Sequence, residues 1–237
     1  MRVEDGFLRS RGLGASLVPP LSLVADDLGI YYDPARPSRL ETLISARAQL
    51  ADDQAARAER LIARLASGSV TKYNLTGAPP ALPDGHRILV PGQVEDDASV
   101  RLGSPVVTTN ADLLARVRAE NPDAVIVWKP HPDVAAGLRP GKVEAPERWA
   151  DVVAPQGDIA ALLRAVDAVW TMTSLTGFEA LVRGVPVTTL GAPFYAGWGL
   201  TRDLGPVPVR RHGGPRPTLA GLVHAALIDY PRYVDPL

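Results

Sequence analysis

Short apolar runs alternate with helical patterns between residues 86 and 190, and this alternation constrains the fold more than any other feature. The apolar runs lie at 88–90, 124–128, 152–153, 168–171 and 186–190, and the helical patterns between them at 110–120, 158–166 and 175–183. Strands separated by helices of about ten residues imply parallel β-α-β units. The sequence therefore predicts an α/β fold with a Rossmann-type, doubly wound parallel sheet, whose ligands bind at the carboxyl ends of its strands.

Helix-start signals place the remaining elements. Ser38 and Glu41 have the spacing of a capping box at the start of a helical region that extends to residue 67. Asp52 is predicted to cap a second helix in this region, which Gly68 ends. In the repeating region, Asn110 and Asp158 are the predicted caps.

The clearest linker is a group of turn-forming residues, Pro79, Pro80, Pro83 and Gly85. It predicts two parts, residues 1–78 and residues 79–237. The first part opens with the end of a strand at 2–7 that enters a loop, and the second ends in a helix near 217–230.

Composition excludes several classes of function. The formal net charge is −1, so no overall field favours nucleic acid or an anionic membrane. The chain has no cysteine, and its four histidines form no HxH or HxxxH pair, which argues against a disulfide framework and a histidine metal site. No apolar run approaches the roughly 20 residues that span a bilayer. The opening residues MRVEDGF do not have the pattern of a signal peptide, so we expect a cytoplasmic protein.

Acidic residues occur in two places where a ligand could bind. Glu4 and Asp5 precede a glycine, which is typical of a solvated turn, and Arg9 and Arg11 behind them suit either an anionic ligand or charge neutralisation. The segment Gln93–Asp97 follows the run 88–90 directly. Its three acids, at 95–97, are compatible with a surface loop, a helix cap or a divalent-metal site.

Two further polar groups follow predicted strands. Lys129 and His131 are held in an extended segment by Pro130 and Pro132, which is compatible with a structural histidine or with an anion site. Thr173 and Ser174 open a predicted helix, where hydroxyls act as caps and free N–H groups can bind phosphate. The chain contains neither GxGxxG nor GxxxxGK[ST], so the dinucleotide and P-loop interpretations fail.

Taken together, these motifs resemble one module of the bacterial capsule polysaccharide β-Kdo transferases, from residue 2 to Asp235. The matching stretches are EDGFLRS (4–10), PLSLV (20–24), DLGIYYD (27–33), PGQVEDD (91–97), KPHPD (129–133), TSLTGFEA (173–180) and PFYAGWG (193–199). The resemblance implies a GT-B-like fold, a CMP-Kdo co-substrate, a glycolipid acceptor, no bound metal and no other cofactor. It further implies a place in capsule linker synthesis, with possible association with the inner face of the inner membrane or the capsule machinery.

The resemblance also implies roles for individual residues. Asp97 would be the nucleophile, His131 would bind the donor phosphate, and Glu4 or Asp5 would do acid/base work, with Glu4 the first choice. The other predicted substrate-binding residues are Lys129, Thr173, Ser174, Gln93 and Arg9. Modules of the family carry several strands and helices before the Glu-Asp-Gly motif, so we expect the N-terminal, acceptor-side half to be incomplete here.

The predicted reaction is a retaining transfer through two inversions, by analogy with retaining glycosidases. Two alternatives stay open. One is an inverting, sialyltransferase-like enzyme in which Asp97 is structural, and the other is a non-catalytic nucleotide-binding module. Product stereochemistry separates the first alternative, and CMP binding without turnover identifies the second.

Overall fold

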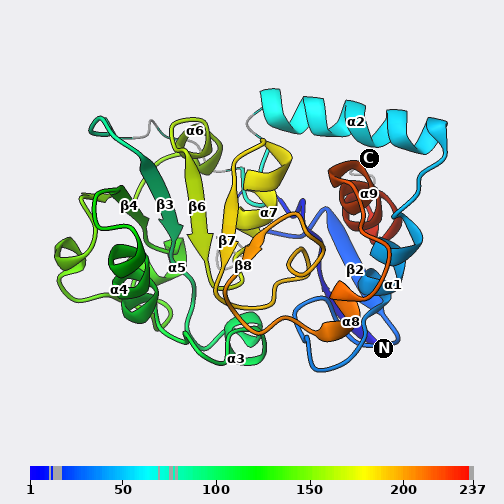
Figure 1. Ribbon diagram of the computed structural model, residues 1–237, viewed down its shortest axis with the longest axis horizontal. Coiled ribbons are helices and arrows are strands. Elements are labelled where there is room, and N and C mark those ends of the chain that lie inside the picture. The colour runs from blue at the N-terminus through cyan, green and yellow to red at the C-terminus, as the bar shows by residue number, and fades with distance from the viewer. Residues whose placement is uncertain (11, 13–17, 69, 75–76, 78–79, 235–237) are drawn as a thin grey trace.

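The computed structural model describes residues 1–10, 12, 18–68, 70–74, 77 and 80–234. Within these residues, six strands form one parallel sheet in the order β5-β4-β3-β6-β7-β8 (Figure 1). The strands are β3 (Arg87–Pro91), β4 (Val125–Lys129), β5 (Val152–Val153), β6 (Ala168–Thr171), β7 (Val187–Thr189) and β8 (Arg202–Asp203). The predicted doubly wound α/β fold is confirmed.

The helices pack around this sheet and beside it. They are α1 (Arg39–Ala46), α2 (Asp52–Ser67), α3 (Ala98–Gly103), α4 (Asn110–Glu120), α5 (Pro132–Ala135), α6 (Ile159–Leu163), α7 (Leu175–Val182), α8 (Val209–His212) and α9 (Leu219–His224). A 3₁₀ turn, η2 (Pro146–Arg148), follows α5, and a π-helical turn, η3 (Ala225–Asp229), continues α9.

Alternation of side chains along the central strand explains the layering. Ile88 and Val90 pack with Leu113 of α4 on one face, whereas Leu89 packs with Leu162 of α6 on the other. Successive residues of a strand point to opposite faces, so a strand covered on both sides is apolar throughout. This is why the region 88–90 is an unbroken apolar run.

The strand order reverses between β3 and β6. The chain passes from β3 outward to β4 and β5, then returns to β6 on the other side of β3. Loops that leave β3 and β6 therefore diverge at this point and leave a crevice at the carboxyl ends of the strands, where open α/β sheets bind ligands.

A second, antiparallel sheet of described residues joins the two ends of the chain. Its strands are β1 (Arg2–Asp5), β2 (Ser22–Asp26) and β9 (Pro231–Tyr233), with β2 in the centre. Glu4 lies opposite Val24, and Val24 lies opposite Pro231. Figure 1 shows α2 alongside α9 in this part of the molecule, and the two helices pack on each other.

The predicted elements of the repeating region are confirmed, with small shifts. Each of the five predicted strands lies within one residue of an observed strand at both ends, and helix α4 has the predicted bounds. Helix α6 is three residues shorter than predicted at its C-terminal end. The predicted linker residues Pro80, Pro83 and Gly85 lie outside helices and strands, and Pro79 lies outside the described residues.

Several helix starts differ from the prediction. Thr109 caps α4, because its side chain accepts from the Asp112 N–H, and Asn110 is the first residue of the helix. Ala51 occupies the N-cap position of α2, and Asp52 follows it. Ser38 does cap α1, and Asp158 and Gly68 act as predicted.

Glu41 differs from its predicted role in a more consequential way. Its carboxylate binds Arg210 and Arg211 instead of completing a capping box, with Oε1 2.7 Å from Arg211 Nε and Oε2 2.8 Å from Arg210 Nε. The Arg211 side chain is only 1% exposed, and its Nη1 also donates to the carbonyls of Ala192, Pro193 and Ala196. This buried ion pair fastens α1 to the glycine-rich loop after β7.

Replacing Glu41 by glutamine should therefore destabilise the protein strongly. Glu41→Gln leaves the buried Arg211 charge uncompensated, and breaking a buried ion pair costs about 3–5 kcal/mol. We expect a fall in the unfolding free energy of roughly 3 kcal/mol, measured by urea denaturation. The control is Arg116→Met, which breaks the exposed Arg116–Glu120 pair and should cost under about 1 kcal/mol. Equal losses in the two variants would contradict this reasoning.

Candidate functional site

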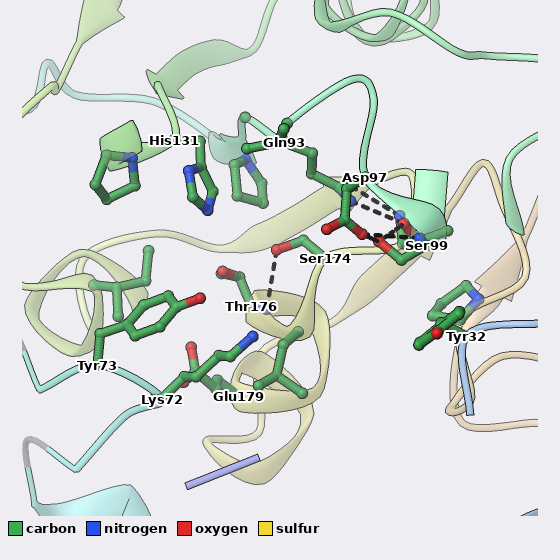
Figure 2. Close-up of a pocket in the computed structure, with 18 of the residues that line it drawn as sticks. Tyr32, Lys72, Tyr73, Gln93, Asp97, Ser99, His131, Ser174, Thr176 and Glu179 are labelled. Atoms are coloured by element: carbon green, nitrogen blue, oxygen red, sulfur yellow. Dashed lines mark hydrogen bonds between the residues drawn. The ribbon is translucent and has the colours of Figure 1, made fainter. Parts of the chain in front are cut away.

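A cavity of about 410 Å³ opens at the carboxyl ends of β3, β4 and β6. Eight of the nine predicted site residues line it: Glu4, Asp5, Gln93, Asp97, Lys129, His131, Thr173 and Ser174. Figure 2 shows His131 and Asp97 on one side of this cavity and Lys72, Tyr73 and Glu179 on the other, with Ser174 and Thr176 between them. Loops that are distant in the sequence thus contribute to one site.

Arg9 is the predicted binding residue that does not line the cavity. Its guanidinium is buried, and it donates to the carboxylate of Asp5, to the Ser10 hydroxyl and to the Val18 carbonyl. Arg9 therefore holds the acidic motif in place from behind.

Gln93 joins the two loops at the strand-order reversal. Its Oε1 accepts from the Thr173 N–H at 2.9 Å and from the Thr171 hydroxyl at 3.2 Å, and its Nε2 donates to the Thr173 hydroxyl at 2.8 Å. The side chain is buried, and these partners occupy both ends of the amide. Gln93 thus sets the position of the β3 loop relative to the start of α7.

Asp97 caps the short helix α3. Its Oδ1 accepts from the Ser99 N–H at 2.8 Å and from the Ser99 hydroxyl at 2.6 Å. Oδ2 has no hydrogen-bond partner among the residues that the structure describes, and the residue is exposed at the cavity. One carboxylate oxygen is therefore oriented by the protein, while the other faces the open space.

The three consecutive acids of this loop bind three different partners. Glu95 accepts from the Asn110 N–H at 2.7 Å, and Asp96 pairs with Arg139 at 2.6 Å. The carboxylates therefore diverge. In the ranges described, no group of three histidine, cysteine or acidic side chains is arranged to hold a metal ion.

His131 is presented as a neutral hydrogen-bond donor. Its Nδ1 accepts from the backbone N–H of Asp133 at 3.2 Å, which assigns the ring proton to Nε2. Burial lowers the pKa of His131, although the nearby Asp133 opposes that shift. A neutral imidazole with its N–H directed into a cavity can donate to a phosphate oxygen.

Lys129 is a partly buried cation at the end of β4. Burial lowers its pKa, and the charge of Asp158 acts in the opposite direction. Its Nζ lies 3.5 Å from the carbonyls of Ala154 and Gln156. Contacts of this length are weak hydrogen bonds, so the ammonium group can still donate to a bound anion.

The start of α7 brings backbone donors to the cavity. Ser174 caps this helix, accepting from the Thr176 N–H, while its own carbonyl accepts from the Tyr195 hydroxyl. Gly177 permits that contact, because a Cβ there would lie 2.2 Å from the Tyr195 oxygen. The partial positive charge at a helix N-terminus favours a bound anion.

The acidic motif contributes two differently bound carboxylates. Asp5 is ion-paired with Arg9, whereas Glu4 accepts from the Tyr32 hydroxyl at 3.1 Å. Burial and the proximity of Glu4 raise the pKa of Tyr32 to about 12, so the phenol remains a donor at neutral pH. Glu4 is thus held by a neutral partner at the edge of the cavity.

Several residues that line the cavity were missed in the sequence, among them Lys72, Tyr73 and Glu179. Lys72 and Tyr73 belong to a segment without a strand or helix signal, and Figure 2 shows the Lys72 ammonium and the Tyr73 hydroxyl directed toward the central space. Glu179 lies in the TSLTGFEA stretch and accepts from the Lys72 N–H at 2.8 Å. Burial raises the pKa of Glu179 to about 6. Of these three residues, only Glu179 lies in a motif from which it could have been found.

The sheet and the cavity define a doubly wound α/β fold with its ligand crevice at the strand-order reversal. Its similarity to two solved transferases makes this a GT-B-like glycosyltransferase fold. Among solved structures, the chain is similar to two of Thermosulfurimonas dismutans KpsC. The β-Kdo 2,7 transferase is 43% identical with a TM-score of 0.81, over 100% of this chain and 71% of that one. The β-Kdo 2,4 transferase is 38% identical with a TM-score of 0.87, over 99% of this chain and 73% of that one.

Sequence comparison identifies the family. Residues 1–76 and 58–233 match the family described as capsule polysaccharide biosynthesis protein, so the chain belongs to that family. Capsule polysaccharide modification protein LipA of Neisseria meningitidis serogroup B is 50% identical over the whole of this chain and 34% of its own length. Lipopolysaccharide-processing protein LpsZ of Rhizobium meliloti is 47% identical over 98% of this chain and 54% of its own length. The chain thus spans between a third and about half of these two curated relatives.

The raised pKa of Glu179 gives a testable dependence of stability on pH. A carboxyl group whose pKa is higher in the folded state stabilises the fold when protonated, so this contribution is lost as the pH rises from about 4.5 to above 6. Glu179→Gln, which stays neutral, should therefore be more stable than the parent at pH 7.5, by up to about 2 kcal/mol. Urea unfolding at pH 4 and pH 7.5 measures the difference, which should nearly vanish at pH 4. The exposed Glu59→Gln is the control, and a pH-independent effect of Glu179→Gln would contradict the prediction.

Proposed function

We propose that the chain is the donor-binding and catalytic part of a retaining β-Kdo transferase, which uses CMP-Kdo and a Kdo-bearing glycolipid acceptor in capsule linker synthesis. One observation carries this proposal: a half-free carboxylate, Asp97, and a neutral imidazole donor, His131, face one cavity from adjacent parallel strands. Membership of the capsule polysaccharide biosynthesis family and the similarity to two β-Kdo transferases support it.

In the first proposed step, the free oxygen of Asp97 attacks the anomeric carbon, C2, of Kdo. The bond between C2 and the phosphate oxygen breaks, and CMP leaves with the electron pair as an anion. His131 donates to the phosphate, and the Lys129 and Lys72 charges with the start of α7 stabilise the developing negative charge. These protein groups can do the work that a metal ion does in other nucleotide-sugar enzymes, so we propose a reaction without a metal.

In the second step, a hydroxyl of the acceptor attacks C2 and displaces Asp97. Glu4 takes the proton of that hydroxyl as general base. We assign this role to Glu4 because its Oε2 has no hydrogen-bond partner within the described ranges, whereas Asp5 is engaged by Arg9. Two inversions give overall retention.

The remaining parts of the proposal concern the acceptor and its location. Residues 1–78 would contribute to the acceptor side and residues 79–237 to the donor side. None of the described helices is long and apolar enough to cross a membrane. We propose that the acceptor lipid brings the protein to the inner face of the inner membrane, alongside other capsule-synthesis proteins.

Calorimetric titration with CMP tests the phosphate site. His131→Ala removes one hydrogen bond to a charged group, so CMP should bind about 1.5–3 kcal/mol more weakly. EDTA should leave the affinity of the parent unchanged. The exposed His86→Ala, at the opposite end of β3, is the control and should bind CMP like the parent. Equal affinity of the His131 variant and the parent would remove His131 from the phosphate site, and a strict magnesium requirement would reinstate a metal.

The covalent step makes the sharpest prediction. Incubated with CMP-Kdo in its complete native polypeptide, the chain should gain one Kdo on Asp97, detected by intact mass and peptide mapping. Asp97→Asn retains the shape of the side chain but not the nucleophile, so CMP binding should persist while adduct and turnover disappear. Normal turnover by the asparagine variant would rule out the covalent mechanism, and inverted product stereochemistry would then favour direct displacement.

A further inference from the structure

Arg139 lies at the rim of the cavity, next to the proposed nucleophile. Its Nη2 donates to Asp96, the residue before Asp97, at 2.6 Å, and its side chain lines the cavity. Nε and Nη1 form no hydrogen bond with any residue that the structure describes. A guanidinium has five N–H donors, so this side chain retains several for a ligand.

The backbone around Arg139 is fastened to the loop that carries Asp97. The Pro140 carbonyl accepts from the Glu95 N–H at 3.2 Å, and the Gly141 carbonyl accepts from Asn110 Nδ2 at 2.8 Å. Gly141 has φ of +127°, and a Cβ there would lie 2.8 Å from both Asn110 Nδ2 and the Gln93 carbonyl. The backbone that carries Arg139 is therefore tied to the start of the loop that carries Asp97, at Gln93 and Glu95.

This arrangement meets a specific electrostatic requirement of the proposed substrate. In a 2-keto-acid sugar such as Kdo, the carboxylate is bonded directly to the anomeric carbon. Attack by Asp97 thus brings two carboxylates together, in a cavity that also contains Glu4, Asp5 and Asp133. A cation beside Asp97 would offset this repulsion.

The other cations of the cavity are placed for the phosphate. Figure 2 shows Lys72 on the side of the cavity opposite Asp97. Lys129 lies at the end of β4 near the carbonyls of Ala154 and Gln156, and His131 is neutral. Arg139, in contrast, is bonded to the residue next to Asp97.

We infer that Arg139 binds the carboxylate of the donor sugar through its remaining donors, and so makes the cavity selective for CMP-activated 2-keto-acid sugars. The inference rests on the proposed function and adds a specificity-determining residue to it. Arginine suits this role because its planar fork matches the geometry of a carboxylate.

Comparison of CMP with CMP-Kdo tests the inference, because the two ligands share the phosphate and differ in the sugar. Calorimetry on the parent and on Arg139→Met should show unchanged affinity for CMP and an affinity for CMP-Kdo at least about tenfold lower in the variant. Arg139→Lys, which keeps the charge but not the fork, should lie between them. Arg116→Met is the matched control, since both arginine side chains are 44% exposed and each is paired with one acid.

The possible failures are distinguishable. If the parent and Arg139→Met bind CMP-Kdo equally well, the role of Arg139 is refuted, while the proposed function is unaffected. An equal loss of affinity for CMP and CMP-Kdo also overturns it, because Arg139 would then act on the phosphate. A parent that binds CMP but not CMP-Kdo refutes the proposed donor, and the inference falls with it.

Discussion

The hydrogen bonds between Gln93 and Thr173 join the two loops at the strand-order reversal, and the rest of the site depends on this connection. At the strand-order reversal, the loops after β3 and β6 leave the sheet in divergent directions, so nothing in the sheet ladder itself determines their separation. The buried Gln93 amide spans that separation with three hydrogen bonds to Thr171 and Thr173. Separating the two loops would leave these buried polar groups without hydrogen-bond partners, which is energetically unfavourable. Asp97 on one loop and Ser174 on the other are thereby placed relative to each other.

Burial and nearby charges act in opposite directions on the pKa values of the basic groups in the cavity. His131 and Lys129 both have lowered pKa values because they are buried, and each lies close to a carboxylate that opposes the shift. An arriving phosphate would favour the charged form of each group. The start of α7 contributes a positive potential that does not depend on pH.

The sequence predicted the parallel sheet closely because its central strands are buried on both faces and so appear as continuous apolar runs. It also led to eight of the residues that line the cavity, since each follows a predicted strand or belongs to a recognisable motif. Lys72 and Tyr73 were not predicted because their segment has no helix or strand periodicity. It reaches the cavity only through tertiary contacts, such as the hydrogen bond from the Lys72 N–H to Glu179. The arginine partners of Glu41 are 169 and 170 residues away, beyond any local capping pattern. Strand β9 was not predicted, since its partner β2 is separated from it by almost the whole chain.

The pairing of β9 with β2 has a consequence for the order in which the protein can mature during synthesis. Strand β1, which carries Glu4, pairs only with β2 in the described structure, and an isolated pair of strands is marginally stable in water. The sheet gains its third strand only when residues 231–233 have left the ribosome. The parallel sheet, by contrast, is complete at Asp203. A nascent chain can thus complete the parallel sheet and its crevice before residues 231–233 are available to complete the sheet that carries Glu4. The part of the site proposed to bind the donor would therefore form before the proposed general base is held in a complete sheet.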